Sequence, residues 1–296
     1  MAKIAIQSVV WDYTVNRIPV APTMGAYVGR TVPNLFIHQR EDNGVVLGHG
    51  TDDYGIIQNR ELMDAARTAL DARGMADFKQ KILVTEGGKR FYGEFTFENK
   101  QLANAVGDVF GFRLVLVNSF DRSTRAAFKL GFLRLVCTNG MATMEKEFSV
   151  TQKHSAKLNL KFLGDAIDKA LANGKDALAI YDELARCIIT DEQGQNILKF
   201  LESKGDLSGV VREGVETLWL NPSRQEDKAR NLYNLYNAAT DYLTHQVEGE
   251  RYEYANQVNS DLLYRFVNIG RNPLKFTEAT TKIITGDEIA LTIKPE

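Results

Sequence analysis

The segment FRLVLVNSFDRSTRAAFKLGFLRLV, residues 112–136, decides the fold of the N-terminal half of this chain. Two runs rich in β-branched and aromatic residues, 112–119 and 126–136, flank the polar turn Asp121-Arg122-Ser123-Thr124. Extended runs on either side of a short polar turn are typical of a β-hairpin. The sequence therefore predicts a pair of adjacent strands at this position.

A second hairpin is expected just before it, in KILVTEGGKRFYGEFTF, residues 81–97. Gly87 and Gly88 supply the positive φ angles that a two-residue turn requires. Further extended segments are predicted at 3–10 and 34–39, where apolar and polar residues alternate. One helix interrupts this region, beginning near Asn59, a good N-cap residue, and ending at Gly74.

After about residue 160 the apolar residues recur every three to four positions, which is typical of helices. Helices are predicted over 158–174, 176–189, 194–205, 208–220, 223–245 and 252–267. The expected fold class is α+β, with a β-rich N-terminal half and a helical C-terminal half. The expected domains are a β-rich nucleic-acid-binding core over 1–155, a helical region over 156–270 and a tail over 271–296.

Charge is unevenly distributed along the 296 residues, although 36 Lys and Arg nearly balance 38 Asp and Glu. Residues 111–162 carry nine positive and three negative side chains, a net charge of +6. Residues 163–296 carry 15 positive and 22 negative side chains, a net charge of −7. The overall charge of −2 therefore does not exclude a nucleic-acid binder.

Several protein classes find no support in the sequence. Two cysteines cannot form a disulfide framework, Gln7 and Ser8 come too early for a signal peptide, and no apolar run approaches the ~20 residues of a membrane helix. A cytoplasmic protein is expected. Cys137 and Cys187 have no histidine at a recognisable spacing, so we interpret them as small buried hydrophobic residues.

Motifs for metal or nucleotide chemistry are also lacking, so we expect no catalytic residue, no metal and no cofactor. The loop Gly48-His49-Gly50-Thr51-Asp52-Asp53 groups one histidine with two carboxylates. Such a group could hold a hard cation and serve an enzyme, but a polar turn between two strands explains it equally.

The basic centre points to phosphate contacts. If Gly131 marks a bulge, Arg125, Lys129 and Arg134 project from one side of their strand. Such a stripe suits a phosphate backbone, and nearby aromatic rings suit stacking on unpaired bases. The candidate phosphate contacts are Lys89, Arg90, Arg113, Arg122, Arg125, Lys129, Arg134, Lys153 and Lys157, and the stacking candidates are Tyr92 and Phe128. The competing interpretation is that these cations are solvated or pair with the acidic C-terminal half.

Three motifs resemble the phage and plasmid family called "domain of unknown function 932". They are Tyr54-x-x-x-Gln58-Asn59, Asn118-Ser119-x-Asp121-x-Ser123 leading to Arg134-x-Val136-Cys137-x-Asn139, and Asn237-Ala238-x-Thr240-Asp241-Tyr242-x-x-His245. The resemblance covers about residues 50–245 and implies a bacteriophage or mobile-element origin. We expect the polar residues of the second motif to build a turn. Asn237, Thr240 and Tyr242 should organise helix packing, and His245 should serve the helix C-terminus.

The order of hairpins and helix also resembles the phage single-strand annealing proteins of the Redβ, RecT and Erf group. That resemblance implies a non-enzymatic homo-oligomer, a ring or filament, that binds single-stranded DNA for recombination. Host or phage replication proteins would be further partners, and no membrane is implied. The alternative is a phage protein-interaction factor that engages a host or defence protein through its acidic helical half.

Overall fold

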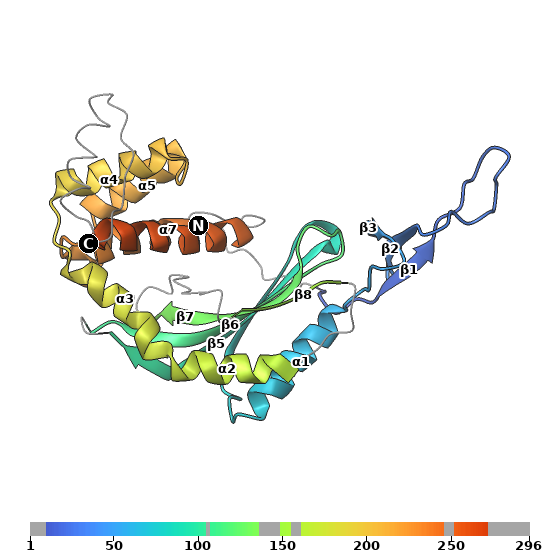
Figure 1. Cartoon of the computed structure of the whole chain (residues 1–296), viewed down its shortest axis with the longest axis horizontal. Helices are drawn as coiled ribbons and strands as arrows, with labels where there is room; N and C mark the ends of the chain where they lie inside the picture. Colours follow the sequence, from blue (N-terminus) through green and yellow to red (C-terminus); the bar gives the residue numbers. More distant parts are fainter. Residues whose placement is uncertain (1–9, 105–106, 136–148, 155–160, 246–251, 272–296) are drawn as a thin grey trace. The chain divides into compact units, whose positions relative to one another are not determined.

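The structure is a computed structural model that describes residues 10–104, 107–135, 149–154, 161–245 and 252–271 (Figure 1). Strands predominate in the first half of the chain and helices in the second, which confirms the predicted α+β class. Of the strand expected at 3–10, all residues but the last lie outside the described part of the chain. No helix of the described part is both long and apolar enough to cross a membrane.

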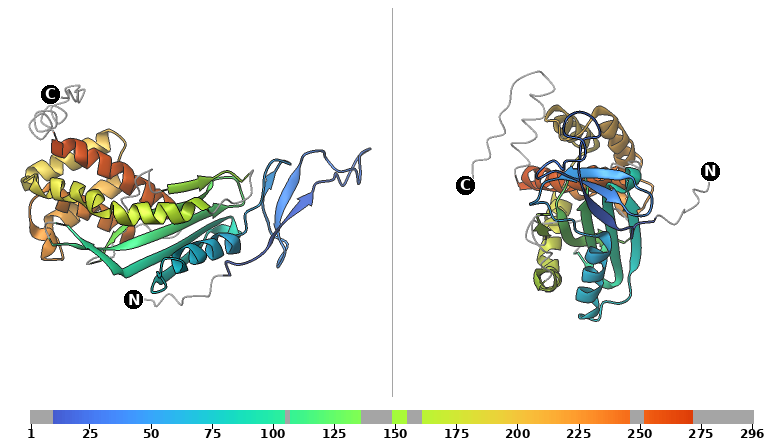
Figure 2. Two further views of the ribbon diagram at one scale, coloured as in Figure 1. Left: turned by 60° about the horizontal axis from the view of Figure 1, so that its bottom comes forward. Right: turned by 90° about the vertical axis from the view of Figure 1, so that its right-hand side faces the viewer.

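A three-stranded sheet comes first. It consists of β1 (Val15–Pro19), β2 (Phe36–Arg40) and β3 (Val46–Gly50), in the order β1-β2-β3, and both pairs are antiparallel. The register shifts between His38 and Gln39, where β2 pairs with β3. The 16 residues between β1 and β2 form a long loop that extends beyond this sheet (Figures 1 and 2).

A larger sheet has five strands in the order β4-β5-β6-β7-β8. These strands are β4 (Lys79–Val84), β5 (Arg90–Ala103), β6 (Val109–Ser119), β7 (Ala126–Arg134) and β8 (Ser149–Gln152). Both predicted hairpins are therefore present. The first one turns through a short 3-10 segment, Glu86–Gly88, and both of its glycines have positive φ angles, 65° and 97°.

Burial of β6 determines which side chains the sheet can offer to solvent. Every residue from Phe110 to Ser119 is buried, whichever face of the strand it occupies. The predicted phosphate contacts Arg113, Arg125, Lys129 and Arg134 required a solvent-facing side on these strands. The polar side chains in the middle of the sheet are instead enclosed, and a buried charge needs a partner there.

Helix α1 (Asn59–Asp71) packs its apolar side, which includes Leu62, Met63, Ala66 and Leu70, into the core. A Cβ atom added to Gly93 of β5 would lie 3.0 Å from Met63 Sδ, so the glycine lets the helix approach the sheet. Gln58 rather than Asn59 is the N-cap residue, and its backbone N–H donates to the Glu61 carboxylate.

The described chain divides into two compact units that differ from the predicted domains. One comprises described residues of 1–100, 112–131 and 144–172, and the other those of 101–111, 132–143 and 173–296. Helix α2 (Lys161–Ala172) belongs to the first unit, where Asp168 pairs with Arg73 of α1 at 2.7 Å. The ends of β5, β6 and β7 contribute to the second unit, so a single cut near residue 155 does not separate the two.

The second unit contains α3 (Gly174–Arg186), α4 (Asp191–Ser203), α5 (Gly209–Leu220), α6 (Leu232–His245) and α7 (Tyr252–Arg271). Helix α6 lies at its centre, in contact with α3, α5 and α7, and all of its residues from Leu232 to Thr240 are buried. Tyr181 of α3 stacks on Phe110 with ring centroids 5.5 Å apart, within the same unit.

The helix predicted over 223–245 begins later, at Leu232. Asn231 ends the preceding segment, because its side-chain oxygen accepts a hydrogen bond from the backbone N–H of Asn234 at 2.8 Å. Residues 226–228 form only a short 3-10 turn. The charged run 224–230 contains good helix formers, but the cap at Asn231 sets the helix start.

Candidate nucleic-acid interface

An open pocket of about 570 Å³ lies beside the turn that joins β6 to β7. Its walls come from that turn, from β7, from β8 and the two residues after it, and from the segment before α1. The lining residues are Tyr54, Arg122, Ser123, Thr124, Arg125, Ala127, Lys129, Thr151, Lys153 and His154. None of these described residues carries a carboxylate, so the lining is cationic and rich in hydroxyl groups.

Neighbouring strands present cations to the same side of the sheet. Ala127 of β7 stands opposite Thr151 of β8, and directly opposite residues of antiparallel strands point to one face. Because side chains alternate along a strand, Arg125 and Lys129 share the face of Ala127, and Lys153 follows on the face of Thr151. Arg125, Ala127 and Lys129 all line the same pocket, which confirms the predicted placement of Arg125 and Lys129 on one side of their strand.

Four side chains, which we call the pocket cations, give the pocket its charge: Arg122, Arg125, Lys129 and Lys153. Within the described part of the chain none of them forms an ion pair, whereas Arg113 of the neighbouring strand β6 pairs with Glu94 at 2.9 Å. Arg122, Arg125 and Lys153 are exposed and Lys129 is half-buried. Unpaired cations around one concavity produce a positive potential that attracts anions.

Arg122 occupies an unusual backbone conformation, with a φ angle of +67°. The left-handed region disfavours residues that carry a Cβ atom, by about 1–2 kcal/mol, and glycine or asparagine usually occupies it. An arginine at this position of the turn therefore costs stability. Backbone strain of this kind concentrates at functional sites, and here it accompanies a side chain that lines the pocket.

The turn itself is held by its own polar side chains. Ser119 Oγ donates to the Thr124 carbonyl at 2.9 Å and accepts from the Thr124 N–H at 3.1 Å. Asp121 accepts a hydrogen bond from the Ser123 N–H at 2.9 Å. Burial alone would raise the pKa of Asp121, but hydrogen bonds from Ser123 and the charge of Arg90 hold it below its usual value. These contacts confirm the predicted turn-building role of Ser119 and Asp121.

A column of three stacked rings supports the pocket from within the same unit. The Tyr54 ring lies between the imidazoles of His38 and His154, with centroid distances of 4.7 Å and 4.9 Å. Since a carbonyl oxygen only accepts, His38 Nδ1–H donates to the Phe120 carbonyl at 2.7 Å. The two imidazoles cover both faces of the Tyr54 ring, so this ring supports the wall of the pocket and is not available to stack on a base.

Burial keeps this column uncharged at neutral pH. Desolvation, together with the charge of neighbouring His38, lowers the pKa of His154 to about 4. Desolvation also lowers the pKa of His38, and it raises that of Tyr54. The positive charge of the pocket therefore comes from its arginine and lysine side chains.

Two of the sequence motifs meet beneath the pocket. Asn118 donates to the Ile57 carbonyl at 2.8 Å and to Asn59 Oδ1 at 2.9 Å, and its own oxygen lies 3.0 Å from His154 Nε2. The Tyr54 hydroxyl donates to the Ser119 carbonyl at 3.1 Å. Asn118 thus does more than build the turn, because it links the turn to the start of α1 and to His154.

Arg113 and Arg134 are not placed as the predicted stripe requires. Arg113 is enclosed in the sheet beside Glu94. Arg134 is 0% exposed, and its guanidinium pairs with Asp108 at 2.8 Å and with Asp227 at 2.7 Å. Both arginines are therefore structural ion-pair partners, and neither reaches solvent to contact a phosphate.

The predicted stacking residues are also buried. Tyr92 and Phe128 are each 3% exposed, because the sheet is enclosed on the faces that carry them. Lys89 and Arg90 are half-buried at the first hairpin turn, where the Lys89 carbonyl accepts from the Phe120 N–H and Arg90 lies 3.6 Å from Asp121. Lys157 lies outside the described residues, as does Cys137.

Sequence reasoning missed the hydroxyl groups and the ring column. Thr124 and Thr151 line the pocket but stand in no family motif, and Ser123, which stands in one, was expected only to build the turn. Tyr54 and His154 are 100 positions apart, and their rings meet only in the folded chain. Tyr54 was marked by the family motif alone, and no pattern in the sequence marked His154.

The loop that groups His49 with two carboxylates forms no metal site in the structure. Asp52 pairs with Arg17 at 3.0 Å, and its backbone N–H donates to Asn34. Among the residues that the structure describes, no group of three or more histidine, cysteine or acidic side chains is placed to hold a metal ion. The half-buried Cys187 caps the C-terminus of α3.

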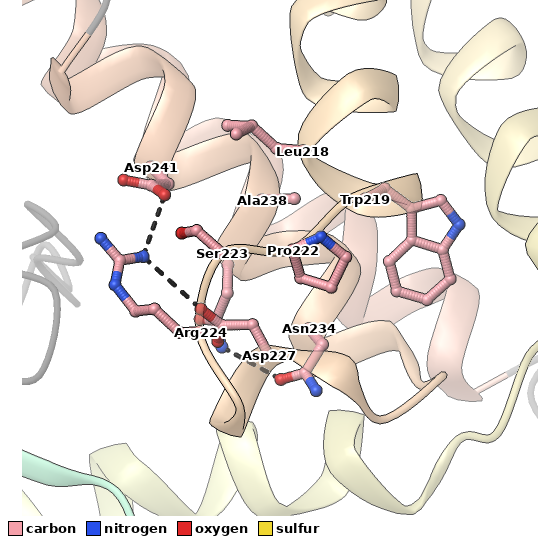
Figure 3. A pocket seen from close by; sticks show the side chains of 10 residues that line it. Leu218, Trp219, Pro222, Ser223, Arg224, Asp227, Asn234, Ala238 and Asp241 are labelled. Atoms are coloured by element: carbon pink, nitrogen blue, oxygen red, sulfur yellow. Dashed lines mark hydrogen bonds and ion pairs between the residues drawn. The ribbon is translucent and has the colours of Figure 1, made fainter.

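A second polar cluster lies in the helical unit (Figure 3). Arg224 pairs with Asp241 at 3.0 Å and lies 3.5 Å from Asp227, and the cavity beside them measures about 10 Å³. Such a volume holds about one water molecule. We therefore interpret this cluster as structural. Asn237 and Thr240 are buried in α6, as predicted, and His245 lies 3.4 Å from Asp241.

These features define an α+β protein with a cationic pocket at a strand turn, whose cations form no ion pair within the described residues. The family model "Domain of unknown function (DUF932)" matches residues 46–268, and the chain belongs to that family. The match includes every pocket residue and leaves β1 and β2 outside. Searches among curated proteins and among solved structures found no match.

Proposed function

We propose that this protein binds single-stranded DNA through the pocket cations and promotes strand annealing, without enzymatic activity and as a homo-oligomer. The observation that carries the proposal is the group of four cations around one pocket, with no ion-pair partner in the described chain. Phosphate oxygens are the ligands that such a group attracts, independently of base sequence. A bacteriophage origin agrees with this function.

The shape of the pocket favours the sugar–phosphate backbone of a nucleic-acid strand over a small, compact anion. The pocket is open along the strand turn, and Ser123, Thr124 and Thr151 add hydroxyl donors between the cations. Phosphate contacts from such groups position a strand and leave its bases free. A strand held by its backbone exposes its base edges to a complementary strand, which is what annealing requires.

The test is a fluorescence anisotropy titration of a labelled 30-nucleotide strand with wild-type protein and with the Arg125→Glu, Lys129→Glu double variant. Losing two phosphate contacts lowers the affinity at least about 25-fold at 0.1 M salt, and like-charge repulsion adds to the loss. The matched control is Lys175→Glu with Lys199→Glu, which changes the same net charge at exposed sites in the helical unit.

Annealing and assembly are tested with the same proteins. The wild type should accelerate the pairing of two complementary labelled strands and form rings or filaments in electron micrographs, and the double variant should anneal poorly. Failure of the wild type to bind any single strand at low salt would overturn the proposal. It would favour the alternative of a protein-interaction factor, to be sought by affinity capture from nuclease-treated host lysate.

A further inference from the structure

The loop between β1 and β2, residues 20–35, is ordered by its own backbone contacts. Val32 N–H donates to the Val20 carbonyl at 2.7 Å, and Gly29 N–H donates to the Pro22 carbonyl at 3.2 Å. The loop therefore continues as a narrow hairpin beyond the three-stranded sheet (Figure 1). Loops of this length without secondary structure of their own are uncommon in compact domains and usually have a function.

Apolar side chains are exposed at the tip of this hairpin. Met24 is 84% exposed, Tyr27 65% and Val28 58%. The Arg30 guanidinium carbon lies 5.8 Å from the centroid of the Tyr27 ring. An exposed aromatic ring beside a guanidinium is the pair of groups that stacks on a base and contacts its phosphate.

The charge around the tip indicates which chemical class of partner it favours. No acidic residue occurs between Tyr13 and Arg40. Arg17 and Arg40 of the same sheet pair with Asp52 and Asp42, but Arg30 has no ion pair within the described residues. An apolar tip that carries a cation, in a segment whose own sequence has no acidic residue, favours a polyanion that also carries aromatic rings.

The three-stranded sheet that carries this hairpin contacts the β6–β7 turn, which also lines the pocket. His38 of β2 donates to the Phe120 carbonyl, and a Cβ atom added to Gly48 of β3 would lie 2.5 Å from that oxygen. Gly48 therefore lets β3 contact the turn directly. Phe120 and Asp121 immediately precede Arg122, so the foot of the three-stranded sheet adjoins the pocket cations.

We propose that Tyr27 stacks on an unpaired base of the strand whose phosphates bind in the pocket, with Arg30 contacting the adjoining phosphate. This inference rests on the proposed function and adds to it a contact with bases. Tyr27 takes the stacking role that the sequence assigned to Tyr92 and Phe128, because those two side chains are buried and that of Tyr27 is exposed. The stacking needs a base with an open face, so it favours single strands over duplexes.

The experiment compares Tyr27→Ala, Tyr27→Phe and wild-type protein on a 30-nucleotide strand and on an abasic strand of equal length. Tyr27→Ala should weaken binding to the base-bearing strand at least about fivefold and leave the abasic strand unaffected. Tyr27→Phe should bind like the wild type. Tyr264→Ala removes an exposed tyrosine from α7 and is the matched control.

The outcomes separate this inference from the proposed function. If the wild type binds and Tyr27→Ala binds the base-bearing strand as tightly as the wild type does, stacking is refuted and the phosphate interface stands. If the wild type binds neither strand, the proposed function itself fails. Sedimentation velocity adds a further check, because loss of the oligomer in Tyr27→Ala would make the tip a self-association element and overturn the stacking proposal.

Discussion

Replacing Arg122 by glycine should raise the stability of the protein and weaken its binding to single strands. Arg122 holds a φ angle of +67°, which costs about 1–2 kcal/mol for a residue with a Cβ atom. Glycine removes that strain but adds about 0.5–1 kcal/mol of conformational entropy to the unfolded chain. The expected net effect is a stabilisation of about 0.5–1 kcal/mol, increased slightly by weaker repulsion among the remaining cations.

The same substitution removes one of four phosphate contacts. Each contact with a single strand contributes about 0.7 to the slope of log K against log salt, so one contact is worth about fivefold in affinity at 0.1 M salt. Urea unfolding measures the stability, and anisotropy titration measures the affinity. Asn34→Gly is the control, because Asn34 is the other described non-glycine residue with positive φ, 55°, and it does not line the pocket.

A gain in stability together with a loss of DNA affinity would show that Arg122 is a functional residue and not a structural one. When a residue that serves only folding is replaced, the protein loses stability, and any loss of binding follows from the smaller folded fraction. If Arg122→Gly destabilises the protein by more than about 1 kcal/mol and leaves the affinity unchanged, Arg122 is structural and the strain has another cause.

Two further predictions concern the buried groups. Arg134→Met leaves the Asp108 and Asp227 carboxylates without their shared partner. The free energy of unfolding measured in urea should therefore fall by about 3–5 kcal/mol, while the folded fraction binds DNA normally. Unchanged stability would contradict the role of Arg134 as a buried ion-pair partner. Because the pKa of His154 is about 4 in the folded state and higher when unfolded, the unfolded chain binds more protons between pH 6.5 and 4. Stability should therefore be full above about pH 6.5 and fall by roughly 3 kcal/mol on acidification to about pH 4. A His154→Phe variant, measured by urea unfolding across this range, should show a shallower decline, and an equal decline would rule out His154 as its source.

Periodicity predicted the elements well and their exposure poorly. The hairpins and most of the helices were found from alternation at period two and recurrence every three to four residues. The same reasoning assigned Arg113 and Arg134 to a solvent-facing stripe, because it assumed that one face of each hairpin meets water. All of β6 from Phe110 to Ser119 is enclosed instead, and Asp227, a partner of Arg134, lies 93 positions away in sequence.

The basic pocket was only half predictable for a related reason. The turn residue Arg122 and the strand residues Arg125 and Lys129 follow each other closely, so alternation along one strand was enough to group them. Lys153 joins them because β8 pairs with β7, and the ring column joins residues 38, 54 and 154. Pairing of this kind depends on tertiary contacts that local patterns do not record.

The most direct test of the central claim is the salt dependence of single-strand binding by the wild-type protein. If all four pocket cations contact phosphates, the slope of log K against log salt is about −2.8 per bound site, and the affinity falls about 50-fold between 50 and 200 mM salt. The Arg125→Glu, Lys129→Glu variant should show a slope nearer about −1.4. A wild-type slope close to zero, or a slope that the double substitution leaves unchanged, would contradict the assignment of the pocket as the DNA interface.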